Sequence, residues 1–283
     1  MNIKVPASSA NLGIGFDTLG LSLNLFNEFQ FKPNFSDKLV NFPDTLENNL
    51  VYMAYTAFFA AHKTPHRRVV ITQMTQDIPV ARGLGSSAAC ILAGVFAANE
   101  IGNLGSSYAE CVRFAADYEG HPDNVYAAAY GGLIGVFADN EKYIHHKFEL
   151  HKSLCYTLLI PAQETNTKEL RDVLPEKIAL DDAVHNVARI AQLPSALVKG
   201  DISKLNLLLD DRIHEPHRLP QLASEEEITQ LKRHKDIAVV LSGSGSSLLV
   251  LSKAPIDDYL TDALLATYKA VAVDIGAKLE IIK

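Results

Sequence analysis

The segment at residues 79–89 has residue types suited to binding a phosphate group. It consists of Pro79, Val80, Ala81, Arg82, Gly83, Leu84, Gly85, Ser86, Ser87, Ala88 and Ala89. Glycines let the backbone turn tightly and bring consecutive N–H groups close to an anion. A helix predicted to begin here adds unpaired N–H donors and roughly half a positive charge. Because the two serine hydroxyls can reach phosphate oxygens or a magnesium ion, this segment is a candidate phosphate loop.

The same glycines also match the dinucleotide-binding pattern G-x-G-x-x-A at residues 83–88, which is a weak signal by itself. In that motif the glycines follow a strand directly, whereas here residues 73–82 intervene. The acidic residue expected about 20 positions later is also missing, because that region is predicted to be helix. A P-loop with Gly-Lys-Ser/Thr is absent. A dinucleotide-dependent enzyme therefore remains the less supported alternative.

Two further segments share this glycine and serine composition. Residues 6–17 contain Asn11 and Asp17, and residues 241–247 contain Gly243 and Gly245. Taken singly, the second is explained equally well as a hairpin turn. Three such segments spread over the chain predict loops that converge on one cleft.

Residues 119–124 place two carboxylates, an imidazole and an amide within six positions. These are Glu119, His121, Asp123 and Asn124. Such groups can bind a metal ion or orient a reacting hydroxyl. The local alternative, favoured for this segment in isolation, is a helix cap with Asp123 near the helix N-terminus after Pro122.

The elements that would position these residues divide into two halves. In the first half, the pattern predicts strands at 69–72 and 133–137 and helices at 86–100 and 107–118. Ser107 and Glu110 have the spacing of a capping box.

In the second half, the predicted order of elements is β-α-β-β-α-β, the split arrangement of ferredoxin-like domains. The elements are a strand at 155–160, a helical region at 181–209, strands at 237–241 and 247–251, a helix at 256–268 and a strand at 279–282. We place the boundary near residue 152, which gives domains 1–152 and 153–283.

Composition narrows the class of protein. Of 283 residues, 48% are apolar and 21% are charged, which is typical of a globular chain. The net charge of −7 argues against nucleic acid or an anionic membrane as partner. The apolar runs are too short for a membrane span, and no stretch resembles a signal peptide, so we expect a cytoplasmic protein. The three cysteines have no metal-binding or redox spacing.

Taken together, these motifs resemble those of the GHMP small-molecule kinases, and within them the homoserine kinases. Residues 6–17 resemble the family's Pro-Ala-x-Ser-Ala-Asn-Leu-Gly-x-Gly-Phe-Asp motif, residues 79–89 its phosphate loop and residues 241–247 its C-terminal glycine-rich motif. Three further segments of the homoserine kinases are matched by residues 119–124, 167–175 and 214–218. The resemblance extends from Pro6 to Gly245, and the first motif and residues 119–124 are its specific parts.

The resemblance implies an α+β fold with two domains. The N-terminal domain would be like domain 2 of ribosomal protein S5, and the C-terminal domain would be ferredoxin-like. It also implies ATP-dependent phosphorylation of the L-homoserine hydroxyl, giving O-phospho-L-homoserine for threonine biosynthesis. The resemblance also leads us to expect a homodimer.

The resemblance also implies roles for individual residues. Residues 79–89, Gly243 and Gly245 would bind ATP, and Ser87 and Glu119 would hold Mg²⁺. Thr167 would meet the γ-phosphate, and Asn48, Asn49 and Val51 would lie near the base. Asn11 and Asp17 would bind the amino end of the substrate and Arg171 and Arg218 its carboxylate, while His121, Asp123 and Asn124 would orient the hydroxyl. Whether Asp123 acts as a general base or the hydroxyl reacts directly stays open.

Two rival interpretations share this fold. A kinase of the mevalonate type would have no ammonium group to satisfy Asp17, and the sugar-kinase signature of galactokinases is absent. A catalytically silent ligand sensor would be expected to have a damaged phosphate loop or no acid at position 119, and neither is found.

Overall fold

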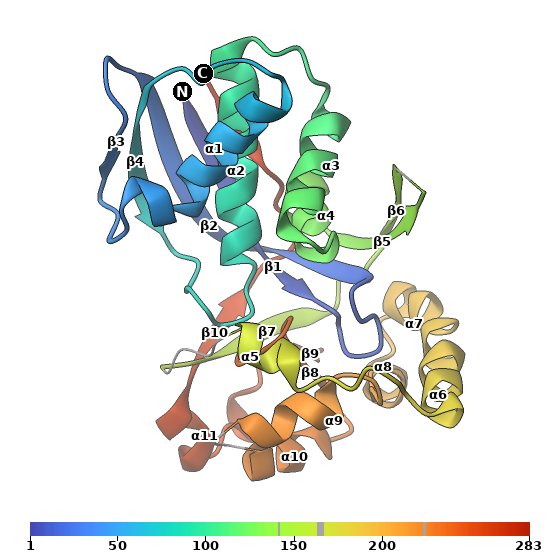
Figure 1. Cartoon of the computed structure of the whole chain (residues 1–283). Coiled ribbons are helices and arrows are strands. Elements are labelled where there is room, and N and C mark those ends of the chain that lie inside the picture. The colour runs from blue at the N-terminus through green and yellow to red at the C-terminus, as the bar shows by residue number, and fades with distance from the viewer. Residues whose placement is uncertain (141, 163–166, 223–224) are drawn as a thin grey trace.

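Two β-sheets organise the chain, and helices pack against both (Figure 1). The computed structural model describes residues 1–140, 142–162, 167–222 and 225–283. No helix in this described part is long and apolar enough to cross a membrane. The predicted α+β class is confirmed to the extent that the described residues form a mixed fold of helices and two sheets.

The first sheet has seven strands in the described part of the chain. Its main path runs β11-β1-β2-β4-β3, and β5 pairs with β2 and with the edge strand β6. Every pairing is antiparallel except that of β3 with β4. The strands are β1 (Asn2–Ala10), β2 (Leu19–Pro33), β3 (Lys38–Val40), β4 (Val69–Gln76), β5 (Leu133–Asp139), β6 (Lys142–Phe148) and β11 (Glu280–Ile282).

Four helices accompany this sheet and share a hydrophobic core with it (Figure 1). They are α1 (Leu50–Ala61), α2 (Ser86–Gly102), α3 (Tyr108–Glu119) and α4 (Asp123–Tyr130), and a short 3-10 turn, η1 (Leu46–Asn48), precedes α1. The capping box at the start of α3 is confirmed, because the Ser107 side chain accepts from the Glu110 N–H and the Glu110 carboxylate accepts from the Ser107 N–H. Ten of the seventeen residues of α2 are buried, so the helix that follows the candidate phosphate loop is part of the core.

The second sheet has four antiparallel strands in the order β10-β7-β9-β8. They are β7 (Cys155–Pro161), β8 (Ile237–Leu241), β9 (Leu248–Ser252) and β10 (Tyr268–Val273). Numbered along the chain, the order is 4-1-3-2, so β9 lies between β7 and β8, as the split β-α-β-β-α-β prediction requires.

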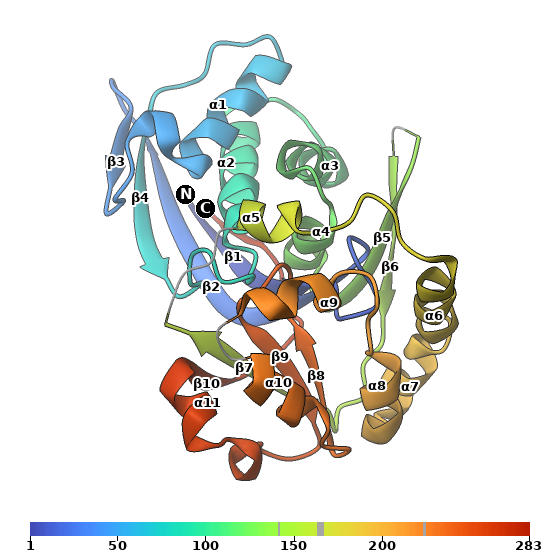
Figure 2. The same cartoon turned by 60° about the horizontal axis from the view of Figure 1, so that its bottom comes forward.

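The helices of this second part are mostly short. They are α5 (Thr167–Asp172), α6 (Leu180–Ile190), α7 (Leu193–Lys199), α8 (Ile202–Leu208), α9 (Glu215–Arg218), α10 (Glu225–Lys232) and α11 (Asp262–Thr267), with 3-10 turns η2 (Leu219–Gln221) and η3 (Asp257–Tyr259). Figure 2 shows α5 and α9 where the two halves of the molecule meet.

One predicted strand belongs to the other sheet. Residues 279–282 were expected to close the second sheet, but β11 pairs with β1 in the first sheet. The fourth strand of the second sheet is instead β10, which pairs with β7 along its whole length. The helix predicted at 256–268 is correspondingly reduced to η3 and the six-residue α11, which Thr261 caps.

The helical region predicted at 181–209 is divided into α6, α7 and α8. Pro194 lies in the first turn of α7, where a proline is tolerated but cannot continue the preceding helix. Gly200 then ends α7 in the left-handed conformation, and the Asp201 side chain caps α8. The helical character was therefore predicted, but the two breaks were not.

The close approach of α1 and α2 gives a test of this packing. A Cβ atom at Gly94 would lie 2.3 Å from the Val51 carbonyl oxygen and 3.0 Å from the Ala54 Cβ. We expect Gly94→Ala to lower the free energy of unfolding by about 1–3 kcal/mol, because overpacking forces the helices apart. Urea denaturation measures this loss.

Ala60→Leu is the matched control, since it adds more carbon at an exposed position of α1 and should change stability by less than about 0.5 kcal/mol. Equal stability of Gly94→Ala and the wild type would contradict the close helix contact.

Candidate active site

A cavity of about 580 Å³ lies where the three glycine-rich segments meet. Most of the predicted site residues line it, namely Asn11, Asp17, residues 79–87, Glu119, His121, Asp123, Asn124, Arg171, Arg218 and Gly243. Ala88 and Ala89 do not line it, because their side chains lie on α2 and are fully buried in the hydrophobic core. Gly245 is also absent from the lining, and Thr167, the first residue of α5, has a side chain outside the described part of the structure.

The candidate phosphate loop ends in a left-handed turn at the start of α2. Gly83 has a φ of +70° and Gly85, the N-cap residue of α2, has a φ of +69°. A Cβ at Gly83 would lie 2.1 Å from the Ser242 carbonyl oxygen, and one at Gly85 would lie 2.2 Å from the Ser8 hydroxyl. Both glycines are therefore required by close contacts as well as by backbone conformation.

The predicted convergence of the three glycine-rich segments is confirmed. The Gly243 N–H donates to the Ala10 carbonyl over 3.0 Å, and the Asn11 amide donates back to the Gly243 carbonyl over 2.8 Å. The Ser242 hydroxyl donates to the Gly83 carbonyl over 2.7 Å. The loop at 241–247 is thus both the hairpin turn between β8 and β9 and a wall of the cavity.

Ser87 and Glu119 lie together beside the phosphate loop. The Ser87 hydroxyl donates to Glu119 Oε2 over 2.8 Å. Burial raises the pKa of Glu119, and the hydrogen bond from Ser87 offsets part of that shift. A hydroxyl and a carboxylate are the oxygen ligands that Mg²⁺ prefers, so this pair fits the ion.

The segment between α3 and α4 brings three polar side chains to the cavity. His121 Nδ1 lies 3.4 Å from Asp123 Oδ1, and this neighbouring carboxylate raises the pKa of His121. Asn124 Oδ1 accepts a hydrogen bond from the Ser8 hydroxyl over 2.9 Å, which orients its amide. Asp123 is the first residue of α4, and its carboxylate accepts from the Asn124 N–H over 2.7 Å. The N-cap position is Pro122 and no described side chain caps the helix, so Asp123 has the predicted place at the helix N-terminus but is not its cap.

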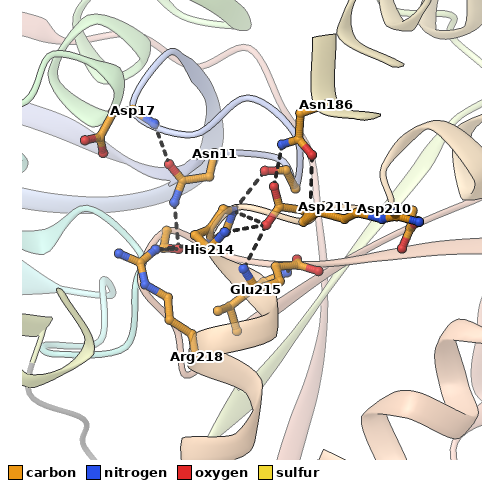
Figure 3. Close-up of polar contacts among 12 residues, drawn as sticks. Asn11, Asp17, Asn186, Asp210, Asp211, His214, Glu215 and Arg218 are labelled. Atoms are coloured by element: carbon orange, nitrogen blue, oxygen red, sulfur yellow. Dashed lines mark hydrogen bonds and ion pairs between the residues drawn. The ribbon is translucent and has the colours of Figure 1, made fainter. Parts of the chain in front are cut away.

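At the other end of the cavity, two arginines and a carboxylate surround an aromatic ring. Arg171 Nη2 lies 2.5 Å from Asp17 Oδ2. The Asp17 N–H donates to Asn11 Oδ1 over 3.0 Å (Figure 3). The Phe16 ring centre lies 6.0 Å from the Arg171 guanidinium carbon and 5.4 Å from that of Arg218. Burial lowers the pKa of Arg218 to about 10, which leaves it a cation at neutral pH.

Several residues around this end were not predicted. Phe16 lies inside a quoted motif but received no role, and His214 was quoted only as part of the motif at 214–218. Asn186 and Asp211 carried no local signal, and they contribute to a buried network because the fold brings α6 against the segment before α9. At the opposite end, Asn48 and Asn49 line the cavity, whereas Val51 does not and is buried in α1.

Comparison with known proteins gives a consistent result. A family model described as the GHMP kinases N terminal domain matches residues 49–132. A homoserine kinase of Moorella thermoacetica is 39% identical over 89% of this chain and 87% of its own length. One from Clostridium beijerinckii is 35% identical over 89% and 86%. The chain belongs to the homoserine kinases.

Solved structures agree on the fold. A homoserine kinase of Cytophaga hutchinsonii superposes with a TM-score of 0.84 over all of this chain and 97% of its own, at 24% identity. A mevalonate kinase structure covers 98% of this chain and 99% of its own with a TM-score of 0.69, at 15% identity. The family therefore makes this chain a kinase, and the dinucleotide-dependent alternative is excluded.

The buried carboxylate of Glu119 leads to a prediction about stability. Because its pKa is raised in the folded state, Glu119 ionises more readily in the unfolded chain. Stability is therefore lost as the pH rises from the unfolded pKa through the folded pKa. We expect Glu119→Gln to be more stable than the wild type at pH 8 without magnesium, and about equal to it near pH 4. Urea denaturation at both pH values measures this difference.

Glu110→Gln is the control, because the Ser107 N–H and hydroxyl lower the pKa of Glu110. This carboxylate stabilises the fold above its unfolded pKa, so its replacement should give no gain at pH 8. A Glu119→Gln variant that is less stable than the wild type at pH 8 would contradict the buried, unneutralised carboxylate.

Proposed function

We propose that the cavity transfers the γ-phosphoryl group of ATP to the side-chain hydroxyl of L-homoserine, giving O-phospho-L-homoserine in threonine biosynthesis. The observation that carries the assignment of residues is the set of charges around Phe16. Asp17 faces Arg171 and lies beside the buried Arg218, in the same cavity as the phosphate loop. A small zwitterion carries an ammonium group and a carboxylate only a few bonds apart, so its site needs a negative and a positive side chain close together.

Substrate recognition would use the Asp17–Arg171 pair as two separate contacts. The ammonium group would bind Asp17, which Asn11 holds in place, and the carboxylate would bind Arg171 and Arg218. Guanidinium groups suit this role because their N–H groups match the oxygens of a carboxylate. Arg171 is half-exposed and on α5, so it can leave Asp17 when a ligand supplies the opposite charges.

The nucleotide would bind at the other end. Backbone N–H groups of residues 79–89 and the α2 N-terminus would hold its phosphates, with Gly243 and Gly245 supporting the loop from the second sheet. Ser87 and Glu119 would hold Mg²⁺, which when bound neutralises phosphate charge. Thr167 is assigned to the γ-phosphate by the motif alone.

Between the two ends, His121, Asp123 and Asn124 would orient the attacking hydroxyl. Ser8 fixes the oxygen of the Asn124 amide, so its NH₂ end is presented as a donor to the substrate. His121 Nδ1 lies 3.4 Å from Asp123 Oδ1, so the carboxylate attracts the charged form of the ring. Phosphoryl transfer depends mainly on such positioning and on neutralising charge, so rigid partners of this kind are what the step requires.

Three further assignments, of domain type, oligomeric state and location, accompany the proposal. The 4-1-3-2 order of the second sheet supports a ferredoxin-like domain at 153–283, after an N-terminal domain at 1–152 like domain 2 of ribosomal protein S5, with β11 returning to the first sheet. The family resemblance supports a homodimer. The proposed place in amino-acid biosynthesis, with ATP as phosphate donor, supports a cytoplasmic location.

The direct test is ADP release from Mg-ATP by the purified protein with L-homoserine, mevalonate, galactose or no acceptor. We expect release that depends on L-homoserine, with phosphate on its hydroxyl. Release with another acceptor would discard the assignment of Asp17, Arg171 and Arg218. ATP binding without release in any mixture would support the silent sensor instead.

The ammonium contact can be tested with an analogue that lacks it. We expect Asp17→Asn to raise the KM for L-homoserine about ten- to a hundredfold, because a charge-assisted hydrogen bond contributes about 1.5–3 kcal/mol. The same variant should act on 4-hydroxybutanoate about as well as the wild type does. Steady-state kinetics with both acceptors measure the two effects.

Asp139→Asn, which removes an exposed carboxylate at the end of β5, is the matched control and should leave both KM values unchanged. An equal loss with both acceptors in Asp17→Asn would show that Asp17 does not bind the ammonium group.

A further inference from the structure

One buried histidine connects the two sides of the homoserine end of the cavity and has no role in the proposed function. His214 precedes α9 and is fully buried. Its Nε2 lies 2.8 Å from the carbonyl oxygen of Gly13, and its Nδ1 lies 3.2 Å from Arg218 Nη1 (Figure 3). The ring therefore lies between the loop that carries Asp17 and a cation of the substrate site.

These two partners determine which ring nitrogen carries the proton. A carbonyl oxygen can only accept a hydrogen bond, so Nε2 must be protonated and donate. A guanidinium can only donate, so Nδ1 must carry the lone pair and accept. The ring is then neutral and a single tautomer. Burial lowers the pKa of His214, which agrees with a neutral ring.

The orientation of the ring is fixed by its own neighbours. Asp211 Oδ2 accepts from the backbone N–H of His214 over 2.7 Å and from that of Glu215 over 2.8 Å. Asn186 donates to the other oxygen of Asp211 over 2.6 Å. Phe16 stacks on the imidazole with ring centres 5.3 Å apart. All these polar groups are buried, so the ring has little freedom to turn.

The Gly13 loop and the Arg218 guanidinium, which the ring contacts, both depend on hydrogen bonds to hold their conformation. Asn11, Leu12 and Gly13 all have positive φ, a conformation that residues other than glycine adopt at a cost. Arg218 donates from Nε to the Leu170 carbonyl and from Nη1 to the Gly243 carbonyl as well as to His214. Among the described residues no hydrogen bond uses its Nη2, which is left for a substrate carboxylate, so the direction of Nη2 depends on these three partners.

We propose that His214 is a positioning residue for the homoserine site. Its Nε2–H donates to the Gly13 carbonyl and its Nδ1 accepts from Arg218, so one ring sets the distance between Asp17 and the guanidinium. This inference rests on the proposed function and adds to it a residue that touches neither substrate nor nucleotide.

The kinetic test compares two substitutions. His214→Leu removes both contacts, and we expect it to raise the KM for L-homoserine about ten- to a hundredfold while the KM for ATP changes less than about twofold. His214→Gln keeps an adjacent donor and acceptor, and we expect it to recover most of the lost affinity. His217→Leu, three residues later on α9 and away from the cavity lining, is the matched control and should leave both KM values unchanged.

An unchanged KM for L-homoserine in His214→Leu would overturn the proposal. So would equal changes in both KM values, or a Gln variant no better than the Leu variant, because these indicate a purely structural role. If the wild type does not phosphorylate L-homoserine at all, the proposed function fails first, and this outcome is distinct from the other three.

A spectroscopic measurement on the wild type covers the case in which the Leu variant does not fold. Ring nitrogen chemical shifts of ¹⁵N-histidine-labelled protein report the tautomer, and the spectrum of His214→Gln assigns the signal. We expect a neutral ring protonated at Nε2 at pH 7. A charged ring, or one protonated at Nδ1, would overturn the proposal whatever the kinetics show.

Discussion

The close contact between backbone atoms of three glycine-rich loops is the constraint on which the site depends. Gly83 lies so near the Ser242 carbonyl that no side chain fits between them. Beside this contact, the Asn11 amide donates to the Gly243 carbonyl and the Gly243 N–H donates to the Ala10 carbonyl. The phosphate loop belongs to the first sheet and the 241–247 loop to the second. Their contact joins the two sheets, and with them the two ends of the cavity.

The residues that bear chemistry were largely predictable, because their types and spacing are local signals. Residues 79–87 and 119–124 are short runs whose glycines, serines and acids are visible in the sequence, and both line the cavity. The central elements of the second sheet were predicted for a similar reason, since β8 and β9 are short apolar runs separated by a turn. In both cases the prediction depends only on residues that are neighbours in the sequence.

What the sequence did not predict depends on distant contacts. β1 contains Ser8 and Ser9, which are buried although their type suggests exposure. The Ser8 hydroxyl donates to Asn124 across the fold, whereas the Ser9 hydroxyl has no hydrogen-bond partner among the described residues. β11 was assigned to the wrong sheet, since pairing with β1 depends on where the chain returns rather than on its own three residues. The Asn186–Asp211–His214 network likewise joins α6 to the segment before α9, and no spacing in the sequence reveals it.

The return of the chain to the first sheet has a mechanical consequence. The second part, from β7 to β10, leaves the first sheet after β6 and rejoins it before β11, so two strands of backbone connect the parts. Two such attachments favour rotation about one axis, the line through them, over other motions that would open the cavity. The N- and C-termini lie next to each other on the first part (Figure 1), so a fusion at either end leaves that axis unobstructed.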